Sequence, residues 1–340
     1  MPHTFKIVLP MAGRGARLRP HTWSRPKQLL TVAGRPMIDH VLDRLDSLPS
    51  TIPREFVFIT GPGGDSLERY LRDSVPDRKA HFVYQSDPYG QSHALYMARE
   101  HLEGPLLMVF PDTLIETDLG FLGRSLDEAV VWVREVPDPE HFGIAQTDRS
   151  GRVRRVVEKP LTREHRQAVV GYYYFPDGGD LADAIEEQLV NDYRPNGVSE
   201  FYLAVAVNLL LARGLVMRSR PVSIWHDGGT VHGLLETNAY LLANGRANFS
   251  GPAESDGTRI VPPVFLDPSA SVEGSLIGPN VSIGAGCRIV NSVIENSIVE
   301  AGAAITACRL EASLIGERAA LSGLTGIISA GDDSFYSSDL

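Results

Sequence analysis

The 340-residue chain has only two cysteines, Cys287 and Cys308, too few for a disulfide framework or a zinc site. No apolar run approaches the ~18 residues of a membrane-spanning helix. The N-terminus lacks the apolar core and the small-residue cleavage site of a signal peptide. We therefore expect a cytoplasmic protein with free thiols.

Acidic residues are absent from the first 38 positions, although the whole chain has a net charge of −10. The overall acidity argues against a general nucleic-acid binder, because phosphate contacts need a basic face. Asp39 is the first acid, and it is preceded by Lys6, Arg14, Arg17, Arg19, Arg25, Lys27 and Arg35. A basic cluster in an acidic chain indicates a small anionic ligand, such as a phosphorylated metabolite.

Apolar strand-like runs alternate with amphipathic stretches over roughly the first 230 residues. We expect strands at 6–9, 56–60, 81–85, 106–110, 130–134 and 222–225, and helices at 37–45, 66–71, 92–101 and 231–246. Such alternation predicts an α/β fold with a Rossmann-like, mostly parallel sheet that binds ligands at the carboxyl ends of its strands. Residues 152–158 and 169–175 are expected to form a small sheet beside the main one.

A different periodicity begins after Val261. Aliphatic residues recur every five or six positions, at 266, 272, 277, 283, 289, 294, 299, 305, 310, 315 and 321. This spacing is typical of a hexapeptide-repeat left-handed parallel β-helix, and its regularity argues against a β-sandwich. We therefore predict a first domain at 1–247, a linker at 248–257, a β-helix at 258–330 and a C-terminal tail at 331–340.

Two closely spaced glycines, Gly13 and Gly15, follow the first predicted strand. Their backbone N–H groups can turn toward an anion there. The pattern lacks the third glycine of a Rossmann fingerprint, and the chain has no P-loop. A plain surface turn with solvated arginines is the alternative. Arg17 can bind two phosphate oxygens at once, and Lys27 adds a positive charge after Pro26. We therefore expect a phosphate-binding loop.

The stretch MAGRGARLRPHTWSRPKQLLTVAGRPMIDHVLDRL resembles the signature of the sugar-1-phosphate nucleotidyltransferases, A-G-x-G-[ST]-R-L-x-P-x-T-x-x-x-P-K-x-L. Further motifs follow in the family's order: YQSDPYGQSHAL at 84–95, LLMVFPDTL at 106–114, FGIAQTDRSGRVRRVVEKP at 142–160, VGYYYF at 170–175 and IWHDGGTVHGLLETN at 224–238. The resemblance covers nearly the whole chain and includes long-form members with a hexapeptide tail. Two positions depart from it, because Ala16 replaces a hydroxyl residue and Pro111 replaces a glycine.

The resemblance implies a role for each matched residue. The implied nucleotide-binding residues are Ala12, Gly13, Gly15, Gln85 and Gly90, the last two at the edge of the base. The implied catalytic residues are Arg17, Lys27, Asp112 and Asp227, and both aspartates are the implied Mg²⁺ ligands. The implied sugar-phosphate-binding residues are Gly143, Glu158, Lys159 and Gly171.

The implied reaction transfers a nucleotidyl group from a nucleoside triphosphate, dTTP or UTP, to a hexose 1-phosphate, glucose 1-phosphate by default, and releases pyrophosphate. GTP with mannose 1-phosphate is an alternative pair. A second alternative, to which Ala16 and Pro111 point, is a regulatory subunit that binds nucleotide sugar without making it. A hexapeptide acyltransferase is disfavoured, because His232 is the last histidine and residues 248–340 hold no lysine. We expect the β-helix to support a homo-oligomer.

Overall fold

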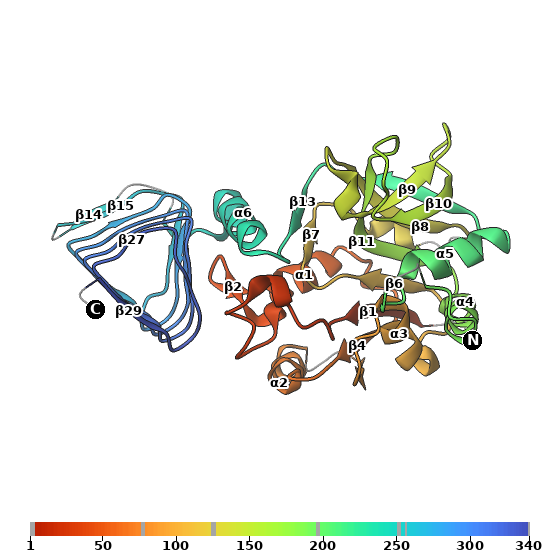
Figure 1. Ribbon diagram of the computed structural model, residues 1–340, viewed down its shortest axis with the longest axis horizontal. Helices are drawn as coiled ribbons and strands as arrows, with labels where there is room; N and C mark the ends of the chain where they lie inside the picture. The colour runs from red at the N-terminus through yellow and green to blue at the C-terminus, as the bar shows by residue number, and fades with distance from the viewer. Residues whose placement is uncertain are drawn as a thin grey trace. The chain divides into compact units, whose positions relative to one another are not determined.

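The computed structural model describes residues 4–75, 79–123, 127–194, 198–249, 253–255 and 257–338. The chain packs as two compact units (Figure 1). The sheet unit consists of Met1–Gly13 and Val41–Trp225, and the β-helix unit consists of Arg14–His40 and His226–Leu340. The segment that carries the signature motif therefore packs with the β-helix, although more than 180 residues of sequence separate the two stretches.

A nine-stranded mixed sheet forms the centre of the sheet unit, in the order β10-β9-β11-β6-β1-β4-β5, with β8 joined to β11 and β12 joined to β8. Strands β6, β1, β4 and β5 are parallel, whereas β11 runs antiparallel to both β6 and β8. The strands are β1 (Phe5–Pro10), β4 (Arg54–Thr60), β5 (Lys79–Tyr84), β6 (Leu106–Val109), β8 (Ala129–Glu135), β9 (Gly143–Thr147), β10 (Val153–Glu158), β11 (Gln167–Phe175) and β12 (Met217–Pro221). This arrangement confirms the predicted α/β fold.

Helices of the sheet unit bury apolar side chains against these strands. Leu95, Ile185 and Val207 come from three different helices and share one core with Val8 and Met108 of the sheet. The helices are α2 (Asp65–Ser74), α3 (Gln91–Met97), α4 (Gly178–Val190) and α5 (Leu203–Ala212). Helix α1 (Met37–Leu45) has the predicted bounds and continues from one unit into the other.

Two predictions about the strands were wrong. The expected strand at 222–225 is shifted, because β12 ends at Pro221 and β13 (Trp225–Asp227) begins three residues later than expected. The small separate sheet does not exist, since β10 and β11 belong to the nine-stranded sheet. The reason is the length of β11, whose nearly continuous burial from Val170 to Phe175 lets it pair with β6, β8 and β9. Strand β7 (Thr113–Ile115) follows β6.

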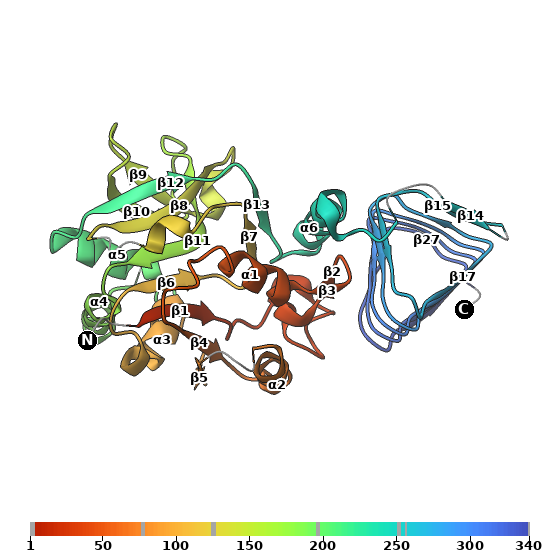
Figure 2. The same cartoon turned by 180° about the vertical axis from the view of Figure 1, so that it is seen from behind.

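Three sheets wind around the apolar core of the β-helix (Figures 1 and 2). Each coil contributes one strand to each sheet, and from β15 onward the pairing is parallel. The first sheet holds β14 (Ala253–Ser255), β15 (Thr258–Ile260), β18 (Leu276–Ile277), β21 (Val293–Glu295), β24 (Arg309–Glu311) and β27 (Thr325–Gly326). The second holds β16 (Val264–Leu266), β19 (Val281–Ile283), β22 (Ile298–Val299), β25 (Leu314–Ile315) and β28 (Ser329–Ala330). The third holds β17 (Ser271–Glu273), β20 (Arg288–Val290), β23 (Ala304–Thr306), β26 (Ala320–Ser322) and β29 (Phe335–Ser337).

The predicted inward-pointing ladder of the left-handed β-helix is confirmed. From Ile277 to Leu321 every predicted position is at most 2% exposed, whereas Leu266 and Val272 of the first coil are half-buried. Ile283 pairs with Val299 and Val299 with Ile315, so successive partners are sixteen positions apart. Coils shorter than three full hexapeptides explain the five-residue gaps in the sequence pattern.

The remaining part of the β-helix unit packs against one side of these coils. Helix α6 (Val231–Leu241) continues into a last turn, Leu242–Arg246. Gly245 in this turn has a left-handed backbone (φ 93°), as expected for a glycine at the end of a helix. The buried Asn238 of α6 accepts a hydrogen bond from the Ala33 N–H (2.9 Å) and another from the Ser282 hydroxyl. The hairpin of β2 (Thr31–Val32) and β3 (Arg35–Pro36) lies beside α6 (Figures 1 and 2). Across the described residues, no helix has the length and apolar character needed to cross a membrane.

Candidate active site

The glycine–arginine loop begins where β1 ends. The Met11 N–H still donates to the Ile59 carbonyl (2.7 Å), so the parallel pairing of β1 continues one residue past the strand. Ala12 is buried against Gly61, where an added Cβ would lie 2.8 Å from the Ala12 Cβ. Gly13 is exposed, with open space around its Cα. The backbone at this point can therefore approach a ligand closely.

Gly15 forms the turn of the loop, with φ 59° and ψ 33°. Its carbonyl accepts a hydrogen bond from the Thr22 hydroxyl (2.8 Å), and a Cβ at this position would lie 3.4 Å from the Lys27 Cβ. Arg17 follows on a short 3₁₀ turn, exposed, while the neighbouring Leu18 is completely buried. The structure thus brings the Gly15 turn and Lys27 together and leaves the guanidinium of Arg17 at the surface.

Gln85 and Gly90 meet in the sheet unit, after the carboxyl end of β5. The Gln85 side chain is 3% exposed, and its Nε2 donates to the Gly90 carbonyl (3.3 Å) and to His93 Nδ1 (2.8 Å). Burial lowers the pKa of His93, so the neutral ring accepts that hydrogen bond. Gly90 has φ 100°, and a Cβ there would lie 2.7 Å from the Phe201 backbone. His93 was missed by sequence reasoning, although it stands one turn into the helix after the glycine.

The predicted sugar-phosphate residues lie on adjacent strands of the same unit. Glu158 is paired in register with Gly143, and a Cβ at Gly143 would lie 3.0 Å from Glu158 Oε2. Burial raises the pKa of Glu158, an effect that Lys159 opposes and Glu200 reinforces. A half-buried carboxylate beside a backbone without a side chain is suited to accept hydrogen bonds from sugar hydroxyls.

Lys159 has a left-handed backbone (φ 47°), and its N–H donates to the Phe142 carbonyl (2.9 Å). Its Nζ lies 5.7 Å from the centre of the Tyr202 ring. Gly171 has a left-handed backbone (φ 84°), and a Cβ at this position would lie only 2.5 Å from Phe110 Cδ2. Both the backbone conformation and the space therefore require a glycine. Sequence reasoning missed Glu200 and Tyr202, which precede α5 and carry no periodic pattern.

The two predicted metal ligands belong to different units. Asp112 follows β6 and Pro111 in a turn of the sheet unit and is half-buried. Asp227 ends β13 in the β-helix unit, is also half-buried, and its Oδ1 accepts the Gly229 N–H (2.8 Å). No cluster of three or more histidine, cysteine or acidic side chains suited to a metal occurs among the described residues. Each carboxylate is of the chemical type that magnesium binds, because that ion prefers carboxylate, phosphate and water oxygens.

Comparisons with known proteins identify the family of the chain. The family model described as nucleotidyl transferase matches residues 6–244. The chain is 30% identical over 336 residues to a glucose-1-phosphate thymidylyltransferase of Streptomyces antibioticus. The matched region covers 92% of each of the two chains. A Streptomyces griseus protein of the same name is 29% identical over 335 residues, again with 92% of each chain. A Bacillus anthracis crystal structure described as a glucose-1-phosphate thymidylyltransferase with sucrose has a TM-score of 0.58 at 24% identity. It covers 73% of this chain and 98% of its own, and it is similar in fold.

Proposed function

Because the chain belongs to the nucleotidyl transferase family, we propose that it transfers a nucleotidyl group from dTTP or UTP to glucose 1-phosphate in a magnesium-dependent reaction. The observation that carries this proposal is the placement of the half-buried Glu158 beside Gly143, with Lys159 directly after it. A carboxylate for the sugar hydroxyls followed at once by a cation for the 1-phosphate is what a sugar phosphate requires.

The attacking group needs positioning rather than activation. A phosphate monoester is mostly dianionic near pH 7, since its second pKa is near 6, so no general base has to remove a proton. Lys159 would hold the 1-phosphate in line with the α-phosphorus, and Glu158 would orient the ring through its hydroxyls. Most of the catalytic effect would then come from alignment and charge neutralisation.

The glycine–arginine loop would bind the triphosphate. Backbone N–H groups at Gly13 and Gly15, the guanidinium of Arg17 and the ammonium of Lys27 would stabilise the charge on the departing pyrophosphate. Asp112 and Asp227 would hold a magnesium ion. When bound, that ion would neutralise phosphate charge and polarise the α-phosphate.

Gln85 supports a uracil or thymine base. Its Nε2 is committed to His93 and Gly90, which directs the carbonyl oxygen of the carboxamide toward the role of acceptor. Uracil and thymine carry an N3–H donor that such an oxygen can accept, whereas cytosine has no hydrogen at N3. We therefore propose that UTP and dTTP are preferred over CTP.

The test is magnesium-dependent pyrophosphate release over a grid of dTTP, UTP, ATP, GTP and CTP against glucose, mannose, galactose and N-acetylglucosamine 1-phosphates. We expect turnover with dTTP or UTP and glucose 1-phosphate. Preference for GTP with mannose 1-phosphate would overturn the substrate assignment. Nucleotide binding without turnover would favour a regulatory subunit and identify Ala16 and Pro111 as the positions to restore.

The proposal includes the setting of the enzyme. We propose a cytoplasmic homo-oligomer assembled through the β-helix, whose sheets extend from β14, inside the predicted linker at 248–257, to β29, inside the predicted tail at 331–340. Light scattering of the purified protein at several concentrations tests the oligomer. A constant monomer mass would refute it.

A further inference from the structure

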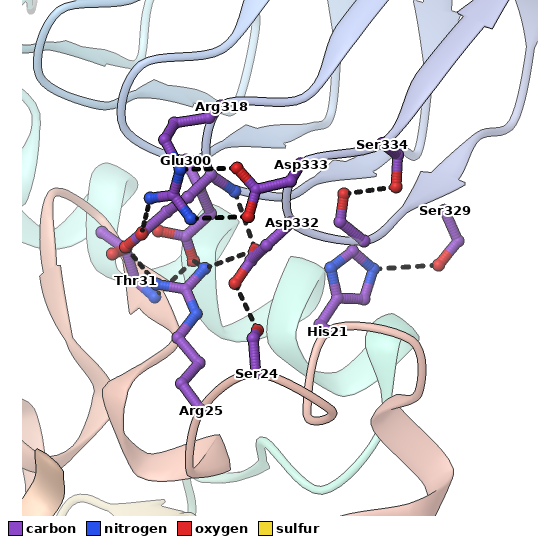
Figure 3. A network of polar contacts seen from close by, with 12 residues as sticks. His21, Ser24, Arg25, Thr31, Glu300, Arg318, Ser329, Asp332, Asp333 and Ser334 are labelled. Carbon is purple, nitrogen blue, oxygen red and sulfur yellow. Dashed lines mark hydrogen bonds and ion pairs between the residues drawn. The ribbon is translucent and has the colours of Figure 1, made fainter.

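The segment Arg14–His40, which we call the signature segment, is tied to the β-helix by Arg25. The Arg25 guanidinium forms ion pairs with three acids of the β-helix (Figure 3). Its Nη1 donates to Glu317 Oε1 at 2.7 Å, and its Nη2 lies 3.3 Å from both Glu300 Oε1 and Asp332 Oδ1. The side chains of Arg25, Glu300 and Asp332 are only 11%, 2% and 4% exposed. We call these four residues the Arg25 cluster. Because it is largely removed from water, loss of one partner leaves buried charge uncompensated.

The three acids come from the same corner of successive coils. Glu300 follows β22, Glu317 follows β25 and Asp332 follows β28, which are neighbouring strands of one sheet. Asp332 Oδ1 also accepts the Glu317 N–H (2.8 Å), which fixes that carboxylate to the β-helix backbone. The acids therefore present a preformed site for the guanidinium, held by parallel pairing.

Contacts on both sides of Arg25 attach the same segment to this corner. The Glu300 carboxylate accepts the Thr31 N–H (2.8 Å), Asp332 accepts the Ser24 hydroxyl, and His21 Nε2 lies 3.0 Å from Ser329 Oγ (Figure 3). A Cβ at Gly331 would lie 3.0 Å from the Pro20 Cβ. The β-helix thus fixes the segment from Pro20 to Thr31 at several points.

This fixed segment supports the Gly15 turn. Thr22, within the segment, donates its hydroxyl hydrogen to the Gly15 carbonyl, and the Lys27 Cβ would lie 3.4 Å from a Cβ at Gly15. Lys27 is two residues after Arg25, and Pro26 between them restricts the backbone. A displacement of Arg25 would therefore move both the Lys27 ammonium and the Thr22 hydroxyl that bonds to the Gly15 turn.

We propose that Arg25 is a positioning residue, through which the corner of the β-helix holds the triphosphate-binding loop in its binding conformation. This rests on the proposed function only for the identity of the ligand. A loop that is ordered before binding loses less conformational entropy on binding. Release from the β-helix would consequently weaken nucleotide binding and leave sugar-phosphate binding nearly unchanged.

The experiment compares Arg25→Lys with Arg318→Lys. The first variant keeps the charge but loses the fork that spans several carboxylates. Arg318 is the matched control, since it is also an arginine that pairs with acids on the same corner of the β-helix, Glu317 and Asp333. We expect Arg25→Lys to raise the KM for the nucleotide about tenfold and to change the KM for the sugar phosphate less than about twofold. Arg318→Lys should change neither.

A second readout does not depend on activity. Trp23 lies within the segment and is 73% exposed, whereas Trp132 is completely buried. We expect Arg25→Lys to accelerate hydrogen–deuterium exchange in peptides from 14–31 and to increase acrylamide quenching of Trp23, with peptides from 276–299 unchanged. Ser24→Ala, which removes one exposed contact with Asp332, should give a smaller effect in the same direction.

The outcomes separate the two proposals. If the wild-type protein releases no pyrophosphate from any pair of nucleotide and sugar phosphate, the proposed function fails. Hydrogen–deuterium exchange and acrylamide quenching then still decide whether Arg25 holds the loop. Wild-type exchange in Arg25→Lys would overturn the positioning role. Faster exchange with an unchanged nucleotide KM would overturn its link to binding. Loss of protection throughout the β-helix in both Arg25→Lys and Ser24→Ala would show a purely structural contact and also overturn the proposal.

Discussion

Glu158 Oε2 lies 3.0 Å from the point that a Cβ at Gly143 would occupy. The two residues face each other on β9 and β10, and Gly143 is not in the left-handed region. The glycine at this position is therefore required by the space beside Glu158 rather than by the backbone conformation.

Gly143→Ala should shift the Glu158 carboxylate by a few tenths of an ångström without unfolding the sheet. We expect the KM for the sugar phosphate to rise about tenfold with little change in thermal stability, because a small misplacement of a substrate-orienting group is costly. Steady-state kinetics and a thermal melt measure both effects. Gly179→Ala is the control, since its Cβ would lie 3.2 Å from Asp177 Oδ1 at the start of α4. An unchanged KM in Gly143→Ala would separate Glu158 from sugar binding.

Arg17→Ala should lower kcat at least about a hundredfold, because it removes a cation from the developing pyrophosphate charge. The fold should persist, since the side chain is exposed. Arg19→Ala is the control, because Arg19 is exposed in the same loop and occupies a variable position of the signature. Equal turnover in the two variants would contradict the role given to Arg17.

Asp227→Asn should keep the local turn and abolish most magnesium-dependent turnover. The amide oxygen can still accept the Gly229 N–H, whereas the negative charge that attracts the cation is lost. We expect turnover to fall at least about a hundredfold at every magnesium concentration. Asp118→Asn is the matched control, since Asp118 accepts the Gly120 N–H in the same kind of turn. Wild-type magnesium dependence in Asp227→Asn would exclude Asp227 as a ligand.

His21 should make the β-helix unit sensitive to acid. Burial lowers the pKa of His21 from 6.5 to about 4, with Asp332 opposing this shift and Arg25 adding to it. The unfolded chain therefore binds a proton before the folded one does, and stability is lost as the pH falls from 6.5 toward 4. The full loss is about 3 kcal/mol.

Urea unfolding followed by far-UV circular dichroism at pH 7 and pH 5 measures this loss. We expect the midpoint to fall more in the wild-type protein than in His21→Gln, which cannot titrate. His232→Gln, which changes an exposed histidine on α6, should retain the wild-type dependence. Equal falls in the wild-type protein and His21→Gln would refute the assignment to His21.

The sequence was informative wherever structure is local. Alternating apolar runs predicted β1, β4, β5, β6 and β8, because each strand buries neighbouring side chains of its own segment. The aliphatic ladder predicted the β-helix for the same reason, since every coil repeats one inward position. The family of the chain was also predicted correctly, from motifs that each lie within a short stretch.

Contacts between distant segments could not be predicted. Glu300 stands where a repeat normally has a turn, and nothing around it indicates that it is buried against Arg25, 275 positions earlier. Glu200 likewise precedes a helix with no pattern that would direct it toward Glu158. Such pairs depend on how elements pack, which periodicity does not specify. The roles of the site residues stay predictions.

The shared corner of the β-helix also sets a lower limit on the length of this chain. Glu300, Glu317 and Asp332 occupy consecutive coils, and the coil that supplies Asp332 and Ser329 is the last of those that the structure describes. A chain that stopped after β26 would lose Ser329 and Asp332, two of the groups that hold the signature segment. A truncation variant that ends after β26 would therefore disturb the glycine–arginine loop as well as the β-helix.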